Sequence, residues 1–84
     1  MTYPLFTRVA LREDFPEYQL CRGDVATIVD RHEAENSQET GYSLEVFNAI
    51  GETIAVLVVE ESKIEPLREN EIFHIRQFHE AAFG

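Results

Sequence analysis

Three stretches of the chain have the residue pattern of β-strands. Residues 5–12 (LFTRVALR) place apolar side chains mainly on one face and arginines on the other, and residues 42–47 (YSLEVF) alternate with period two. Residues 25–29 (VATIV) are rich in β-branched side chains, which suit a pleated sheet. The pattern therefore predicts three strands, of which the first and third bury one face each.

A fourth stretch, residues 53–59 (TIAVLVV), is apolar at both odd and even positions. A strand with one solvent-exposed face would alternate, so this pattern predicts a strand whose second face is covered. The cover has to come from the C-terminal tail of the same chain or from another subunit.

The C-terminal part allows two predictions. Residues 64–67 are typical of a short turn, and residues 71–76 (EIFHIR) concentrate β-branched and aromatic side chains, which favours a fifth strand. Alternatively, Asn70 caps a helix that runs to Phe83. We favour the strand, because the Ala-containing part of the sequence begins only after it.

Together these elements predict a mainly β fold, a small five-stranded SH3-like barrel with a C-terminal tail. A chain of 84 residues has room for one domain, so residues 1–84 are expected to form a single β-barrel domain with residues 78–84 as its tail. Residues 13–22 (EDFPEYQLCR) contain a proline and several apolar side chains, which predicts an ordered loop packed on the core.

Three segments carry a resemblance to a known family. LFTRVALREDFPEY, RGDVATIVD and IEPLRENEIFHIR resemble an uncharacterised bacterial family, often cyanobacterial, that is known as a domain of unknown function. The resemblance extends from Leu5 to about Phe78. The Gly-Asp pair before a Val/Ile-rich strand is also similar to the KOW-type segment of small barrels. The resemblance implies a small β domain and no assigned site.

The stretch RGDVATIVD, residues 22–30, can be a turn that starts a strand or a recognition loop. Gly23 tolerates positive φ and Asp24 can accept hydrogen bonds from nearby amides, so a turn needs no further explanation. A KOW-like RNA surface needs basic and aromatic side chains together, whereas this chain has 16 acidic and 7 basic residues and a net charge of −9. We therefore expect a turn and no nucleic-acid partner.

Composition also suggests where the protein acts. The longest apolar run is far shorter than the roughly 18 residues that predict a membrane-spanning helix, and no signal peptide pattern is present. The single cysteine, Cys21, cannot form an intramolecular disulfide. We expect a cytoplasmic protein that has no membrane partner.

Residues able to do chemistry are few and scattered. Cys21 beside Arg22 could be a nucleophile, but free cysteines are usually buried and inert, so packing is the preferred interpretation. The three imidazoles are His32, His74 and His79, and the spacing of the last two matches neither a helical nor a strand metal pair. The paired carboxylates are interpreted as solvated surface. We expect no catalytic, cofactor or metal site.

Interaction with protein is the remaining function. The two-sided strand and the phenylalanines of the tail need cover, and small barrels expose edge strands that pair across interfaces. We expect His74 and Arg76 on one face of the last strand, either as a recognition stripe or as partners of acidic residues. The candidate interaction residues are Val56, Val58, Phe73, His74, Arg76, Phe78 and Phe83.

The sequence thus favours a non-enzymatic protein-interaction module, an acidic accessory or regulatory subunit that self-associates. Its partner would be a protein of unknown identity, and its charge would steer it toward basic surfaces. The first alternative is a purely structural homo-oligomer. A small ligand-binding barrel or enzyme is the third hypothesis.

Overall fold

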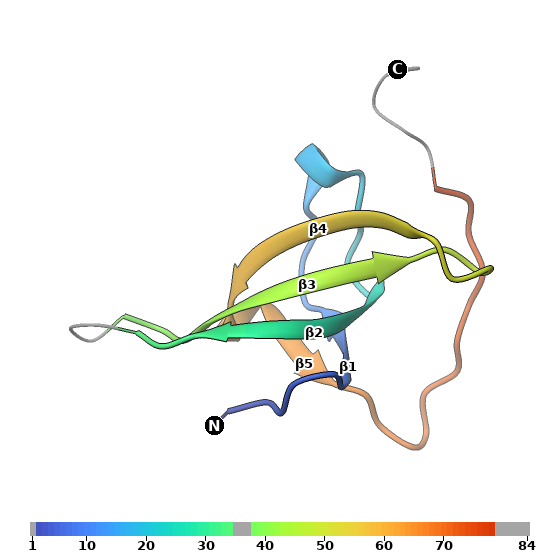
Figure 1. Ribbon diagram of the computed structural model, residues 1–84. Coiled ribbons are helices and arrows are strands. Elements are labelled where there is room, and N and C mark those ends of the chain that lie inside the picture. The colour runs from blue at the N-terminus through green and yellow to red at the C-terminus, as the bar shows by residue number, and fades with distance from the viewer. Residues whose placement is uncertain (1, 35–37, 79–84) are drawn as a thin grey trace.

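The computed structural model describes residues 2–34 and 38–78, and it places five antiparallel strands in one sheet. In chain order the strands are β1 (Arg8–Leu11), β2 (Val25–His32), β3 (Gly41–Phe47), β4 (Thr53–Glu60) and β5 (Ile64–Pro66). Two short 3-10 helices are η1 (Pro16–Tyr18) and η2 (Glu61–Lys63). The order in the sheet is β4-β3-β2-β1-β5, so the protein is mainly β, as predicted (Figure 1).

The sheet does not close into the barrel that the sequence led us to expect. β4 pairs only with β3, and β5 pairs only with β1, so the described residues leave two open edges. The sheet is nevertheless curved, as Figure 1 shows for β4. The β2–β3 register shifts between Ile28 and Asp30, and such irregularities bend and twist a strand.

The fifth strand lies earlier in the chain than we predicted. Ile64 pairs with Leu11 and Pro66 with Val9, so the segment expected to be a turn is β5. Proline lacks a backbone N–H, which an edge strand tolerates. Residues 71–76 form no strand, and within the described range 71–78 no helix follows Asn70. The rest of that alternative helix lies outside the described residues.

The core lies on one face of the curved sheet, and every strand contributes to it. The side chains that form the buried cluster are Val9, Leu11, Leu20, Ala26, Ile28, Tyr42, Leu44, Val46, Leu57, Val59 and Ile64. Tyr42 is buried, and its hydroxyl accepts a hydrogen bond of 2.9 Å from the backbone N–H of Tyr3. The period-two patterns of the sequence therefore predicted the buried face of β3 correctly and that of β1 at Val9 and Leu11, whereas Leu5, expected on the same face, is exposed and precedes β1.

The β1–β2 connection is ordered, as predicted, and packs on the core through the buried Leu20. The backbone N–H of Phe15 donates to the Leu20 carbonyl at 2.9 Å, which closes the loop around η1. Asp14 Oδ1 accepts the N–H of Arg22 at 2.8 Å. The loop ends in a turn at Gly23, whose φ of +93° favours glycine, and β2 then begins.

The described helical segments, η1 and η2, are each three residues long, and neither could cross a membrane.

Candidate functional site

The outer face of β4 is apolar and uncovered by any described residue. Leu57 and Val59 point into the core, whereas the exposed fractions of Val56 and Val58 are 57% and 65%. The neighbouring positions on β3 are Glu45, opposite Val56, and Ser43, opposite Val58. The strand is two-sided as its sequence predicted, but the expected cover is not supplied by the described part of the tail.

The chain beyond β5 runs past the start of β2 instead of along β4 (Figure 1). Residues 67–71 form a linker, in which the N–H of Glu71 donates to the Arg68 carbonyl at 3.1 Å. We call residues 72–78 the strap. It is neither strand nor helix, and no backbone hydrogen bond joins it to the sheet among the described residues. Side chains alone therefore hold it.

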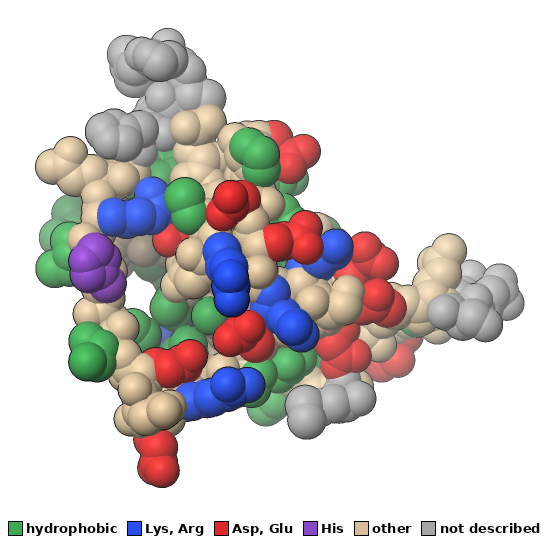
Figure 2. Space-filling model, turned by 180° about the vertical axis from the view of Figure 1, so that it is seen from behind, with side chains coloured by type: hydrophobic (Ala, Val, Ile, Leu, Met, Phe, Trp, Pro, Cys, Tyr) green, Lys and Arg blue, Asp and Glu red, His purple; other side chains and the backbone are tan. Residues whose placement is uncertain are grey.

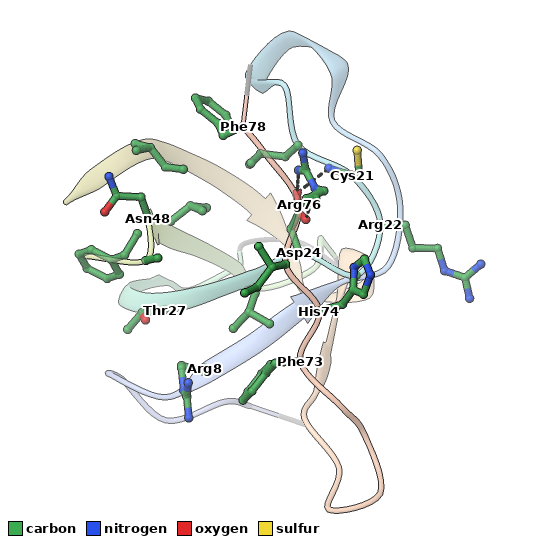
Figure 3. Close-up of a pocket in the computed structure, with 18 of the residues that line it drawn as sticks. Arg8, Cys21, Arg22, Asp24, Thr27, Asn48, Phe73, His74, Arg76 and Phe78 are labelled. Atoms are coloured by element: carbon green, nitrogen blue, oxygen red, sulfur yellow. Dashed lines mark hydrogen bonds and ion pairs between the residues drawn. The ribbon is translucent and has the colours of Figure 1, made fainter. Parts of the chain in front are cut away.

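The main anchor of the strap is an ion pair between Arg76 and Asp24. Arg76 Nε donates to Asp24 Oδ1 at 2.9 Å, and its Nη2 donates to Oδ2 (Figure 3). This two-point geometry is the strong form of an arginine–carboxylate contact. The hydrogen bond to Asp24 raises the pKa of Arg76, so the guanidinium stays charged. The ion pair joins residues 52 positions apart in the chain.

The Asp24 carboxylate also organises its own turn. Its Oδ2 accepts the N–H of Cys21 at 2.7 Å, and its backbone N–H donates to the Cys21 carbonyl at 3.0 Å. The side chain of Asp24 is only 18% exposed. The carboxylate is therefore fixed by the turn at Gly23 independently of Arg76, and it faces the strap.

Aromatic side chains lie at both ends of the strap. The ring centroid of Phe73 is 5.3 Å from Arg8 Cζ, a cation–π contact, although Phe73 remains 65% exposed. Phe78 is partly buried and packs against the core cluster. His74, between them, is exposed. In Figure 3 the strap runs from Phe73 beside Arg8, past Asp24, to Phe78.

Between the strap and the end of the sheet lies an open groove of about 800 Å³, which we call the Asp24 groove. Its walls come from the starts of β1, β2 and β4, the loop before β2, the end of β3 and the turn that follows, and they include the apolar side chains of Val25, Val46 and Ile54. Val56 and Val58 do not line it. The described residues thus present two separate surfaces, the β4 edge and the Asp24 groove.

The predicted interaction residues divide between these surfaces. Val56 and Val58 lie on β4, and Phe73, His74, Arg76 and Phe78 lie on the strap. Phe83 is outside the described residues. His74 and Arg76 do not share a strand face, because no strand forms there, and Arg76 has an acidic partner.

Asp24, the partner of Arg76, was not among the residues that the sequence pattern indicated as candidates. Its place in RGDVATIVD indicated only a turn, and the turn prediction is consistent with the positive φ of Gly23.

The candidate chemical residues lie apart. Cys21 is exposed in the loop and is not part of the core cluster. His32 Nε2 lies 2.7 Å from Ser43 Oγ. No cluster of three metal-ligating side chains occurs in residues 2–34 and 38–78.

Charged side chains of both signs are interspersed on the face shown in Figure 2. Two ion pairs link neighbouring segments: Arg12 Nε lies 3.6 Å from Glu65 Oε2, and Lys63 Nζ lies 3.1 Å from Glu13 Oε1. The hydrogen bond to Glu13 raises the pKa of Lys63. Several carboxylates thus pair with nearby cations at the surface.

These features define a small all-antiparallel β domain that has an apolar open edge and a side-chain-held strap. Residues 5–66 match the family described as a domain of unknown function (DUF4926), and the chain belongs to this family. The match ends at Pro66, the last residue of β5, so the strap lies outside it. No curated protein and no solved structure matches the chain.

Proposed function

We propose that this protein is a non-enzymatic protein-interaction domain, an acidic accessory subunit of the cytoplasm, and that it self-associates through β4. The observation that carries the proposal is the open β4 edge, where Val56 and Val58 are more than half exposed. Edge strands present unpaired backbone groups to a second strand, and natural proteins usually protect them with charge, proline or a covering segment. The middle of β4 has no such protection among the described residues.

An antiparallel β4–β4 contact between two copies is the simplest use of this edge. Such a contact is self-complementary about a twofold axis, and it would place the exposed valines of the two copies side by side on the outer face of one extended sheet. A purely structural homo-oligomer would use the same contact, but would bind no other chain.

The curved five-stranded sheet with its core on one face also supports our proposal that the fold is an open relative of the SH3-like barrel.

Charge gives this proposal a distinctive salt dependence. Each copy carries a net charge of −9, so two copies repel at low ionic strength. Raising salt from about 10 mM to about 100 mM shortens the screening length from about 30 Å to about 10 Å. Self-association should therefore strengthen over this range, whereas binding to a basic partner should weaken.

The deciding experiment compares Val58→Lys with Ile50→Lys in the full chain. Both add the same charge at an exposed residue, but Ile50 lies in the β3–β4 turn, at 80% exposure, and not on the edge. Sedimentation velocity over a range of concentrations measures the mass of each. We expect the wild type and Ile50→Lys to form a homogeneous multiple of the chain, and Val58→Lys to remain monomeric, since a lysine on an edge strand opposes pairing.

A wild-type protein that stays monomeric at both salt concentrations would refute self-association. The interaction function would then depend on a partner that binds the wild type and Ile50→Lys, but not Val58→Lys. Equal binding of that partner by all three proteins would exclude β4 as the docking surface.

A further inference from the structure

The strap is seated like a bound peptide rather than like a part of the sheet. It is extended, it lacks backbone pairing with the sheet among the described residues, and its anchors are the side chains of Phe73, Arg76 and Phe78. Extended peptides are recognised in this way when pockets and charges, instead of a strand ladder, read their side chains. The surface under the strap therefore has the properties of a peptide-binding site.

The Asp24 carboxylate, the hydrogen-bond acceptor at the centre of this surface, is positioned by residues outside the strap. The N–H of Cys21 donates to Asp24 Oδ2, and the tight turn at Gly23 fixes the backbone of the neighbouring residue. A carboxylate held this way loses little freedom when a guanidinium arrives, which favours binding. Arginine matches it better than lysine, because a planar guanidinium can contact both oxygens.

The division between groove and strap coincides with the family boundary. All residues of the groove wall that precede the linker lie within residues 5–66, the part of the chain that matches the family. The opposite wall, formed by residues 72–76 and Phe78, lies outside the matched part. The matched domain thus supplies Asp24 and the sheet wall of the groove, and the segment after the match supplies the wall that contacts Asp24.

We infer that the Asp24 groove is a binding site for an extended peptide segment of a partner protein, one that carries an arginine and an aromatic residue two positions later. In the free protein residues 73–78 cover this surface as an intramolecular substitute, in which Arg76 makes the contact with Asp24 and Phe78 the aromatic contact. The partner segment displaces the strap by forming the same contacts together with others of its own. The acidic charge of the domain attracts such a basic segment.

A second copy of the chain is the weaker candidate for the occupant. The linker of residues 67–71 already brings the strap to its own groove, and a short tether gives an effective concentration in the millimolar range. A strap from another copy has the same sequence and would make the same contacts, so it cannot compete with the strap that is already tethered beside the groove. This site is separate from the β4 edge, so the inference and the proposed function can fail independently.

The test is a titration of the full-length, ¹⁵N-labelled protein with the unlabelled peptide EIFHIRQF, the sequence of residues 71–78. The Cys21 amide, bonded to Asp24, reports on the site in two-dimensional NMR spectra. In the Arg76→Ala protein the strap loses its main anchor, so the peptide should bind roughly fivefold tighter or more than to the wild type. Arg68→Ala, which changes an exposed linker arginine, should behave as the wild type does.

Two further samples test the role of the carboxylate. Adding Asp24→Asn to Arg76→Ala keeps an acceptor for the Cys21 amide but removes the charge, and should weaken binding roughly fivefold or more. A peptide with Arg76→Gln should lose as much affinity for the Arg76→Ala protein, and this comparison needs no further change in the protein.

The inference is overturned if saturating peptide leaves the Cys21 amide unmoved in Arg76→Ala, or if the Arg76→Gln peptide binds equally well. It is also overturned if the wild type dimerises and Asp24→Asn alone abolishes the dimer, because a second copy would then occupy the groove. A loss of dimer in Val58→Lys with unchanged peptide binding would support both surfaces.

Discussion

Residues 42–47 (YSLEVF) and residues 71–76 (EIFHIR) have similar compositions, with β-branched and aromatic side chains among polar ones. The first lies in β3, an interior strand of the sheet, where Leu44 is fully buried and β3 pairs with β2 on one side and β4 on the other. The second forms part of the strap, where Ile72 and Ile75 are both 92% exposed. The two segments differ in the partners that they find rather than in their intrinsic preference.

The β-propensity of these residues reflects how well their side chains fit a half-buried sheet, and it does not by itself make the segment a strand. A segment becomes a strand when neighbouring backbone and an apolar face are both available to it. Pairing on both sides gives the first segment its register. The second passes the end of the sheet, where Arg76 contacts the Asp24 carboxylate and no described strand edge pairs with the segment.

The largest effect that would sharpen this contrast is expected in the core. Leu44→Ala should reduce the free energy of unfolding by about 2–5 kcal/mol, since it leaves a cavity among packed side chains. Ile75→Ala, a similar truncation in the strap, should change it by less than about 0.5 kcal/mol. Urea unfolding measures both, and comparable losses would mean that the strap belongs to the cooperative core.

A smaller loss is expected at Gly23, where sheet and strap meet. Its φ is +93°, and an added Cβ would meet no atom within 4 Å, so any cost of substitution comes from the backbone. Gly23→Val should lose about 1–2 kcal/mol, because L-residues avoid positive φ. Gly23→Asn should lose less, since asparagine tolerates the left-handed region better. Unchanged stability in Gly23→Val would refute the turn.

Breaking the strap should affect stability less than changing the turn. The Arg76 side chain is 37% exposed, so solvent screens its ion pair, and Arg76→Ala should cost less than about 1 kcal/mol of global stability. The strap itself should open more often, which chymotrypsin cleavage after Phe73 would measure as a several-fold faster rate than in Arg68→Ala. Equal cleavage rates would mean that Asp24 does not hold the strap.

The smallest predicted effect concerns alkaline pH. Desolvation raises the pKa of Tyr3 above its ordinary value of 10.0, with nearby acidic groups adding to the shift. Above that value the unfolded chain releases the Tyr3 proton before the folded chain does, so stability falls as pH rises and is unaffected below. Tyr3→Phe should show a shallower alkaline decline in melting temperature. An identical slope would contradict this role.

Local patterns predicted four of the five strands, because period-two alternation and β-branched residues report directly on a half-buried pleat. β5 escaped prediction, since three residues ending in Pro66 acquire their strand character only by pairing with β1. The same limit applies to closure of the sheet, because the alternation of a strand does not reveal which edges meet.

The residues of the candidate site show more clearly what a local sequence pattern can and cannot predict. Val56 and Val58 were predictable, because an apolar residue at the wrong phase of a strand is visible in the sequence. The contact of Asp24 with Arg76 was not, since it joins residues 52 positions apart and depends on the path of the strap. The surplus of acidic residues indicated only that Arg76 would find some carboxylate.

The pairing of Leu11 with Ile64 has a consequence for how the chain folds. The β2–β3 and β3–β4 contacts join strands that follow one another directly, whereas β1 and β5 must close a loop that spans most of the matched domain. Loop-closure entropy makes such distant contacts slow to form. We expect the β2–β3–β4 meander to form first in refolding and β5 to join last. During synthesis β1 emerges before β5. We expect the edge of β1 that pairs with β5 to stay unpaired until residues 64–66 have been made.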